Sequence, residues 1–298
     1  MKRFAEKAKA FAVASAVCCL TGLAAASAAS TAENPARNAG TETILLIGSD
    51  RRDGTWNGNS DAMLAAKIDF DEKKISLVSF MRDIGAEIPG HELMKLNAAY
   101  ALGGAELLEE TLYENFGVET DGYVSTDFEG MIEIVDALGG VDMEVRDAEV
   151  DVVNMYVTSM CMDMGLDEEE YLLESGGDLH LNGMQATAFC RVRFVGNSDY
   201  ERTERQRRIL SSMFEAFRPD DAAQAAKTAA LIVAKTESKL PPEFLLKAAP
   251  ELLRLSEYEI ETARVPFDGA YSTQGEMLIP SQPDTNERIA ALLGTKAE

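Results

Sequence analysis

Thr43-Ile44-Leu45-Leu46-Ile47-Gly48 is a continuous apolar run near the start of a chain of 298 residues. Such a run, bounded by polar residues, predicts a strand that is buried on both faces. Outward from it, Ala62–Phe70 and Lys74–Phe80 have the composition of two further strands. The polar residues Asp71-Glu72-Lys73 between them predict a hairpin turn.

The rest of the chain alternates between helical and extended patterns. Helices are expected at 96–102, at 105–116, from the N-cap residues Thr126 and Asp127 to Gly139, at 201–217 and within 220–256. Further strands are expected at 122–125, 141–145, 188–195 and 258–266. This alternation indicates an α/β sheet with helices on its faces. No repeat and no internal linker interrupts residues 43–298, which are expected to form one domain.

The N-terminus has the pattern of an export segment. A positive region is followed by the uncharged, mostly apolar run Ala10–Ala29. The positive residues are Lys2, Arg3, Lys7 and Lys9. Residues 1–29 therefore predict either a cleaved signal peptide or an uncleaved membrane anchor, followed by a flexible linker over 30–42. Either alternative places the remainder outside the cytoplasm, at the outer face of the membrane or in the cell wall.

The net charge bears on the possible binding partners, and the cysteines bear on a possible disulfide. The formal net charge is −23, so no nucleic acid partner is expected, because phosphate backbones require a broad positive surface. Two cysteines, Cys161 and Cys190, follow the export segment. In an exported protein they either form a disulfide or stay as small buried residues.

Residues 146–180 differ from their surroundings. Between Asp147 and Asp178 there are ten acidic residues and no Lys or Arg, and methionines occur at 155, 160, 162 and 164. The segment predicts a helical insertion at the edge of the site, with a solvated acidic face. A second interpretation is that the methionine face contacts a lipid or a ligand.

Arginines are concentrated between Arg191 and Arg208, where six of them occur in an acidic chain. The expected strand at 188–195 would place Arg191 and Arg193 on one face. The following helix would place Arg202, Arg205 and Gln206 on a shared face near its start. Because guanidinium groups fit phosphate and carboxylate oxygens, this pattern indicates an anion site. The alternative is a set of salt bridges to Asp199, Glu201 and Glu204.

Two further charged sets lie at strand ends. Asp50 and Asp61 stand in polar segments beside strands, where two carboxylates and a pyrophosphate would supply oxygen ligands for Mg²⁺. The alternative is that both are turn residues bound to their own backbone. Arg82 and Asp83 follow a strand and precede Lys95 in the sequence. They are expected either to belong to a charged site or to form a single structural ion pair.

Other chemistries lack the required residues. The chain has two histidines, His91 and His180, and no GxSxG, P-loop, GxGxxG or CxxC motif. This inventory argues against a histidine-centred hydrolase or a zinc enzyme.

Seven motifs along the chain resemble the LytR-CpsA-Psr proteins of bacterial cell envelopes, in family order. They are Gly48-Ser49-Asp50-Arg51-Arg52, Ser60-Asp61, Arg82-Asp83, Lys95-Leu96-Asn97-Ala98-Ala99-Tyr100 with Gly103-Gly104, Asp136-Ala137-Leu138-Gly139-Gly140-Val141-Asp142, Arg191-Val192-Arg193, and Asp199-Tyr200-Glu201-Arg202-Thr203-Glu204-Arg205-Gln206. The resemblance covers residues 43–293. The sequence departs from the family pattern at Asn59, Met81 and Ile84.

The resemblance implies a fold and an activity. The fold would be an α/β/α sandwich with a central mixed sheet and an apolar tunnel for a polyprenyl tail. The activity would be phosphotransfer of a glycopolymer from an undecaprenyl-pyrophosphate carrier to peptidoglycan, or to a protein. The alternatives are a pyrophosphatase that uses water at the same site and a non-catalytic module that binds lipid or polymer.

The resemblance also assigns roles to residues of this chain. Asp50 and Asp61 would hold Mg²⁺, or Mn²⁺ in its place. The pyrophosphate would be bound by Arg52, Arg82, Lys95, Arg191, Arg193, Arg202 and Gln206. Arg82, Asp83, Arg193 and Asp199 would be catalytic, with Asp83 and Asp199 as candidates for activating the acceptor hydroxyl.

Overall fold

A computed structural model describes residues 40–51, 58–193, 195, 198–216, 222–251, 254 and 257–295. The expected export segment, most of the expected linker and Arg52 lie outside these residues. The first strand starts at Thr41, two residues earlier than expected. None of the helices in these ranges has the length and apolar character needed to cross a membrane.

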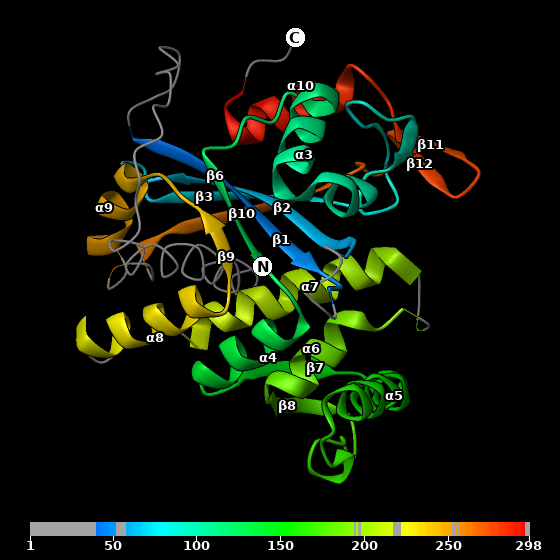
Figure 1. Ribbon diagram of the computed structural model, residues 1–298, viewed down its shortest axis with the longest axis vertical. Helices are drawn as coiled ribbons and strands as arrows, with labels where there is room; N and C mark the ends of the chain where they lie inside the picture. Colours follow the sequence, from blue (N-terminus) through cyan, green and yellow to red (C-terminus); the bar gives the residue numbers. More distant parts are fainter. Residues whose placement is uncertain are drawn as a thin grey trace.

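The centre of the molecule is a mixed six-stranded sheet (Figure 1). Its strands, in spatial order, are β10 (Glu259–Val265), β3 (Lys74–Phe80), β2 (Ser60–Asp69), β1 (Thr41–Ser49), β6 (Gly122–Thr126) and β9 (Glu237–Lys239). β1 pairs with β6, and β3 with β10, in parallel, whereas the other neighbours are antiparallel. The C-terminal ends of β1, β3, β6 and β10 therefore lie at one edge of the sheet, together with the start of β2.

Helices cover both faces of this sheet, as Figure 1 shows. On one face lie α3 (Ala98–Phe116) and α10 (Asp284–Leu293). The opposite face is covered by α4 (Phe128–Ala137), α5 (Asp147–Met164), α6 (Gly183–Arg191), α7 (Ser198–Ala216), α8 (Ala222–Ala234) and α9 (Pro242–Glu251). This arrangement confirms the expected α/β/α architecture with a central mixed sheet.

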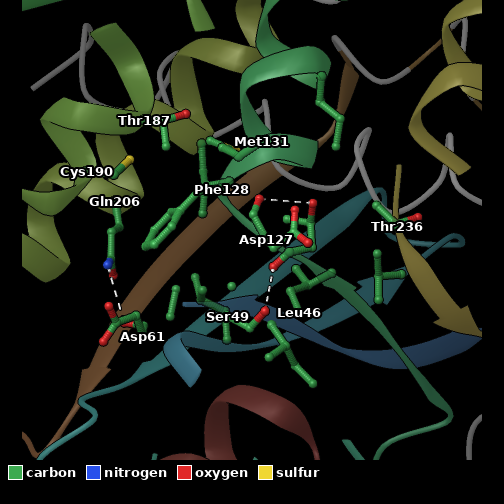
Figure 2. Close-up of a pocket in the computed structure, with 18 of the residues that line it drawn as sticks. Leu46, Ser49, Asp61, Asp127, Phe128, Met131, Thr187, Cys190, Gln206 and Thr236 are labelled. Atoms are coloured by element: carbon green, nitrogen blue, oxygen red, sulfur yellow. Dashed lines mark hydrogen bonds between the residues drawn. The ribbon is translucent and has the colours of Figure 1, made fainter. Parts of the chain in front are cut away.

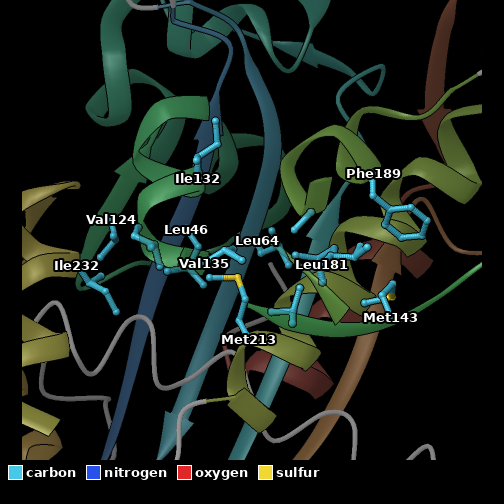
Figure 3. Close-up of a cluster of buried hydrophobic side chains, with 14 of the residues drawn as sticks. Leu46, Leu64, Val124, Ile132, Val135, Met143, Leu181, Phe189, Met213 and Ile232 are labelled. Atoms are coloured by element: carbon cyan, nitrogen blue, oxygen red, sulfur yellow. The ribbon is translucent and has the colours of Figure 1, made fainter. Parts of the chain in front are cut away.

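The buried apolar residues form two clusters, one on each face of the sheet. Along β1, Ile44 and Leu46 face the α4–α8 side, whereas Leu45 and Ile47 face α3. Figure 3 shows the first cluster, where residues of β1, β2 and β6 meet side chains of α4, α6 and α7. Burial on both faces explains why this strand is a continuous apolar run.

Three small antiparallel pairs extend the sandwich. They are β4 (Gly85–Glu87) with β5 (Leu93–Lys95), β7 (Val141–Val145) with β8 (Gly177–Leu181), and β11 (Tyr271–Gln274) with β12 (Met277–Pro280). The expected helical insertion at 146–180 is helical over α5 and the short 3₁₀ helix Glu168–Glu170, but its end is the strand β8. That strand pairs with the one that precedes the insertion, which closes the segment into a compact unit.

Several expected elements match the structure closely. The hairpin between β2 and β3 is present, with Met63 paired to Phe80 and Asp69 to Lys74. The expected helices at 96–102 and 105–116 are the two parts of α3, separated by non-helical backbone at Gly103 and Gly104. Gly104 has a φ of 72°, a conformation that residues with a side chain rarely adopt.

The expected strand at 188–195 is wrong, because residues 183–191 form the helix α6. Asn182 caps this helix: its side chain accepts from the Gln185 backbone N–H, and the Gln185 side chain accepts from the Asn182 backbone N–H. This capping box and the alanines that follow favour a helix. The apolar alternation at Cys190 and Val192 was therefore a misleading signal, and Arg191 and Arg193 do not share a strand face.

The proposed Cys161–Cys190 disulfide is also absent, and both cysteines are free thiols. Cys161 is buried near the end of α5, and Cys190 is the penultimate residue of α6. Burial raises the pKa of the Cys190 thiol to about 12. Cys161 is therefore a small buried residue, whereas the free Cys190 is half-buried.

Candidate active site

The candidate site lies at the sheet edge where β1 ends and β2 begins. Asp50 directly follows β1, and its backbone N–H donates to the Asn59 carbonyl oxygen at 3.0 Å. Asp61 is the second residue of β2. The two sequence-predicted metal ligands therefore stand on neighbouring strands at one edge of the sheet.

A β-bulge determines the direction of the Asp61 side chain. Gly48 pairs with Ala62 and Ser49 pairs with Ser60, which leaves Asp61 as the extra residue on β2. Strict alternation would place Asp61 on the α3 side with Met63. Because of the bulge, Asp61 instead points to the α4–α8 side of the sheet, where it lines the same cavity as Ala62.

Three arginines from separate elements converge on the Asp61 carboxylate. Arg202 Nη2, from the first turns of α7, lies 2.9 Å from Asp61 Oδ2. Arg82 Nη1, just after β3, lies 3.2 Å from Asp61 Oδ1, and Arg193 Nη2, after α6, lies 3.6 Å from the same oxygen. Three guanidinium groups therefore share this one carboxylate as a partner.

Arg202 and Gln206 also hold the backbone of Asp61. Arg202 Nη2 donates to the Asp61 carbonyl oxygen at 3.2 Å, and Gln206 Nε2 donates to it at 3.3 Å, as Figure 2 shows for Gln206. The two residues are four apart on α7, so they share a face. Arg202 and Gln206 therefore reach the same backbone oxygen of Asp61 from one face of α7.

The positive surroundings keep Asp61 ionised. Burial raises the pKa of its carboxyl, but Arg202, with Arg82 and Arg193, outweighs burial and holds the pKa below its usual value. A carboxylate that stays charged can act as the counter-ion of the three arginines and as an oxygen ligand for a cation.

Asp83 and Lys95 form a second layer beside this cluster. Lys95 Nζ lies 2.8 Å from Asp83 Oδ1 and 3.0 Å from Glu276 Oε2, whereas Arg82 Nε lies 3.5 Å from Asp83 Oδ2. The hydrogen bond to Asp83 raises the pKa of Lys95, so that its ammonium group stays charged. Lys95 is therefore linked to Asp61 through Asp83 and Arg82.

Arg191 lies at the cavity in a different setting. Its guanidinium carbon is 4.4 Å from the ring centroid of Phe128 and 4.9 Å from that of Tyr156. Aromatic faces attract a cation and hold the planar guanidinium in a fixed orientation. Arg191 lines the cavity, but it reaches it from the end of α6 rather than from a strand.

Asp50 and Asp61 suit Mg²⁺ in their chemistry. Asp50 Oδ1 accepts from the Asn59 backbone N–H at 2.5 Å. Within the described ranges, no cluster of three or more His, Cys, Asp or Glu side chains could enclose a metal. Mg²⁺ does not need one, because it binds one or two carboxylates and takes its other ligands from phosphates and water. The donor set fits a metal that is held jointly with a phosphorylated substrate.

An apolar cavity of about 140 Å³ opens behind the charged cluster. Figure 2 shows it between the sheet and the helices. Asp61, Arg191, Arg202 and Gln206 line its polar end, whereas the remainder is almost entirely apolar. The apolar lining includes Leu46, Leu64, Val124, Met131, Ile134, Leu210, Met213 and Ile232.

The sequence analysis did not assign two residues of the site and misplaced a third. Asp127 lines the cavity, and its side chain caps α4 by accepting from the Gly130 N–H at 3.0 Å. It also lies 3.4 Å from Arg51. The position of Asp127 directly after a strand was the signal that could have identified it. Glu276 had no signal in the sequence. Arg205, expected on the face of Arg202 and Gln206, instead pairs with Glu149 at 2.7 Å.

For two predicted site residues, Asp199 and Arg52, the structure does not describe the side chain. Asp199 lies in the first turn of α7, but its side chain is outside the description, and Arg52 is outside it altogether. The salt-bridge interpretation holds for Arg205, which pairs with Glu201, and for Arg207, which pairs with Glu204. Arg202 and Arg193 pair with Asp61, and a pairing of either with Asp199 lies outside the described side chains.

Comparison with known proteins identifies a family and individual relatives of this chain. The LytR_cpsA_psr family model matches residues 18–292. Regulatory protein MsrR of Staphylococcus aureus is 28% identical over 240 residues, 80% of this chain and 68% of MsrR. Polyisoprenyl-teichoic acid–peptidoglycan teichoic acid transferase TagU of Enterococcus faecalis is 32% identical over 177 residues, 58% of this chain and 52% of TagU.

The fold is shared with solved structures. The structure of TagT bound to LI-WTA superposes with a TM-score of 0.63 at 23% identity, covering 86% of this chain and 92% of TagT. The family model spans nearly the whole chain, from residue 18 to residue 292. The chain therefore belongs to the LytR-CpsA-Psr family.

Proposed function

We propose that this protein is an extracytoplasmic phosphotransferase that moves a glycopolymer from an undecaprenyl-pyrophosphate carrier to peptidoglycan. A protein acceptor would use the same chemistry. The donor and acceptor classes are those that the name of TagU gives, a polyisoprenyl-teichoic acid–peptidoglycan teichoic acid transferase. The proposal is further supported by the structure of TagT bound to LI-WTA.

One observation carries the proposal. Arg82, Arg193 and Arg202 converge on Asp61 at the polar end of an apolar cavity. A polyprenyl pyrophosphate has the matching shape, with a dianionic head and an apolar tail. The head would replace Asp61 as partner of the guanidinium groups, and the tail would enter the cavity.

The proposed reaction is a displacement at phosphorus. The acceptor hydroxyl oxygen forms a bond to the phosphorus next to the sugar, and the bond from that phosphorus to the bridging oxygen breaks. Polyprenyl phosphate leaves, and the hydroxyl proton passes to a carboxylate, for which Asp83 and Asp199 are the candidates. The arginines stabilise the charge on the equatorial oxygens and on the leaving phosphate.

The metal would be held by Asp50 and Asp61. When bound together with phosphate oxygens, Mg²⁺ or Mn²⁺ supplies charge neutralisation and orientation. The protein's own groups orient the substrate: Arg202 and Gln206 fix the Asp61 backbone, and the apolar walls exclude water from the tail.

Substitution of the arginines tests the proposal. With a polyprenyl-pyrophosphate-linked glycan as donor, peptidoglycan fragments as acceptor and Mg²⁺, Arg82→Ala and Arg193→Ala should each lower the release of polyprenyl phosphate by about 100-fold or more. Circular dichroism should show an unchanged fold. Arg254→Ala serves as the control, because Arg254 is exposed and its two described ion pairs are local ones, with Glu251 and Glu257. Wild-type rates in both site variants would refute the assignment.

A further inference from the structure

Arg205 is a fully buried arginine next to the site whose donors do not point at Asp61. Only 1% of its surface is exposed. Its Nε lies 2.7 Å from Glu149 Oε1, and its Nη2 lies 2.9 Å from Glu201 Oε2. Nη1 donates to the Val192 carbonyl oxygen at 3.0 Å, and Nη2 to the Val195 carbonyl oxygen at 3.2 Å.

The two carbonyl groups that Arg205 binds flank Arg193. Val192 itself is fully buried, and its N–H donates to the Phe189 carbonyl oxygen at 3.3 Å. The backbone on both sides of Arg193 is therefore tied to one guanidinium group. Because a guanidinium is rigid and planar, it fixes the spacing between the two carbonyl oxygens, which a lysine could not do.

Glu149 holds Arg205 from the other side. This carboxylate is completely buried in the first turn of α5, where it accepts from the Arg146 backbone N–H at 2.8 Å and from Arg146 Nη2 at 2.8 Å. Burial raises the pKa of the Glu149 carboxyl, but the bonds from Arg146 and Arg205 outweigh it, so the pKa lies below its usual value. The start of the acidic insertion is thereby joined to the segment that carries Arg193.

We propose that Arg205, held by Glu149, is a positioning residue that keeps Arg193 directed at the anion site. The inference rests on the proposed function, since it gives Arg193 a pyrophosphate to bind. The inference also gives the insertion at 146–180 a role, because the first turn of α5 would support the arginine cluster. Arg205 touches neither substrate nor metal and acts through the backbone at Val192 and Val195.

A double-mutant cycle separates positioning from general stability. The dissociation constant of geranylgeranyl pyrophosphate is measured on the full-length protein. Arg205→Lys should weaken binding about tenfold in the wild-type background and less than about twofold in the Arg193→Ala background, because a residue that acts through Arg193 has nothing left to position. Equal losses in both backgrounds would overturn the proposal, because they would indicate a purely structural role.

Arg208→Lys is the matched control. Arg208 is on the same helix, and its Nη2 donates to the Glu144 carbonyl oxygen rather than to the segment around Arg193. The control should bind the probe as the wild type does. If it weakens binding as much as Arg205→Lys does, the specific link from Arg205 to Arg193 is wrong.

Hydrogen exchange gives a readout that needs no ligand. In Arg205→Lys, the peptide that contains Arg193 should exchange about tenfold faster than in the wild type, and unchanged exchange would overturn the proposal. Glu149→Gln keeps the side-chain size and should produce the same direction of change, which covers the case that Arg205→Lys does not fold. Failure of the wild type to bind the probe would refute the proposed function alone, because the exchange result still decides the positioning role.

Discussion

Asp61 is the residue on which the arginine cluster depends. Arg202, of which only 3% is exposed, has this carboxylate 2.9 Å away, and two further guanidinium groups lie within 4 Å. Removing the charge of Asp61 takes away the partner that these three cations share in a partly buried place. The stability of the ligand-free protein should therefore depend on this one carboxylate.

Asp61→Asn should lower the free energy of unfolding by about 3 kcal/mol at neutral pH, as expected when one partner of a buried ion pair is removed. The pKa of Asp61 is lower in the folded state than in the unfolded chain. Its stabilisation is therefore present above the ordinary carboxyl pKa and is lost as the pH falls through the folded-state pKa.

Urea unfolding across the acid range provides the measurement. The difference between Asp61→Asn and the wild type should shrink as the pH is lowered below about 4. Asp151→Asn, at an exposed position of α5, should match the wild type throughout. A difference for Asp61→Asn that stays constant down to about pH 2 would contradict the charge-based explanation.

At the scale of elements, most of the longer strands were predictable because their local sequence carries the signal. The apolar run at 43–48 and the alternation at 141–145 are the signals of a strand buried on two faces and on one face. The short edge strand β9, Glu237–Lys239, carries no such signal, because all its residues are exposed. Its pairing with β6 comes from the tertiary fold alone.

At α6, the apolar alternation of the sequence led to a wrong prediction of a strand. Val192 is buried and follows Cys190, so residues 188–195 gave the alternation expected of a strand. The start signal at Asn182 and Gln185 was the better guide, because it gives the backbone N–H groups at a helix start a partner. Arg191 and Arg193 were still assigned to the site, but for an incorrect geometric reason.

Asn182→Ala tests that start signal. The variant should lose about 1 kcal/mol of unfolding free energy, because the Gln185 backbone N–H loses its side-chain acceptor. Asn182→Asp should stay close to the wild type, since aspartate caps helices equally well. Chemical denaturation distinguishes the two variants. Equal stability of Asn182→Ala and the wild type would show that the capping box does not stabilise α6.

At the scale of the whole molecule, the site could be identified but not assembled from the sequence. The residues were recognisable as charged motifs at strand ends and helix starts. Their pairing was not, because Arg202 lies 141 positions along the chain from Asp61. The bulge that turns Asp61 toward the cavity, and the hairpin that brings Glu276 to Lys95, depend on tertiary contacts that no local pattern encodes.

The cavity between sheet and helices gives a prediction of its own. Met131 lines it from α4. Met131→Trp should fill part of the space and weaken geranylgeranyl pyrophosphate binding about tenfold, while the affinity for inorganic pyrophosphate stays unchanged. Met162→Trp is the control, because Met162 is 77% exposed on α5. Calorimetric titration provides both affinities, and equal losses for the two ligands in Met131→Trp would argue against the cavity as a tail site.

The most direct test of the phosphotransferase proposal is the mass of the acceptor after reaction. The purified full-length chain is combined with Mg²⁺, a polyprenyl-pyrophosphate-linked glycan and peptidoglycan fragments. We predict that the acceptor gains the glycan together with one phosphate, while polyprenyl phosphate is released in equal amount. Release of polyprenyl phosphate with an unmodified acceptor would contradict the proposal and indicate a hydrolase. Tight donor binding without turnover would contradict it equally and indicate a binding module.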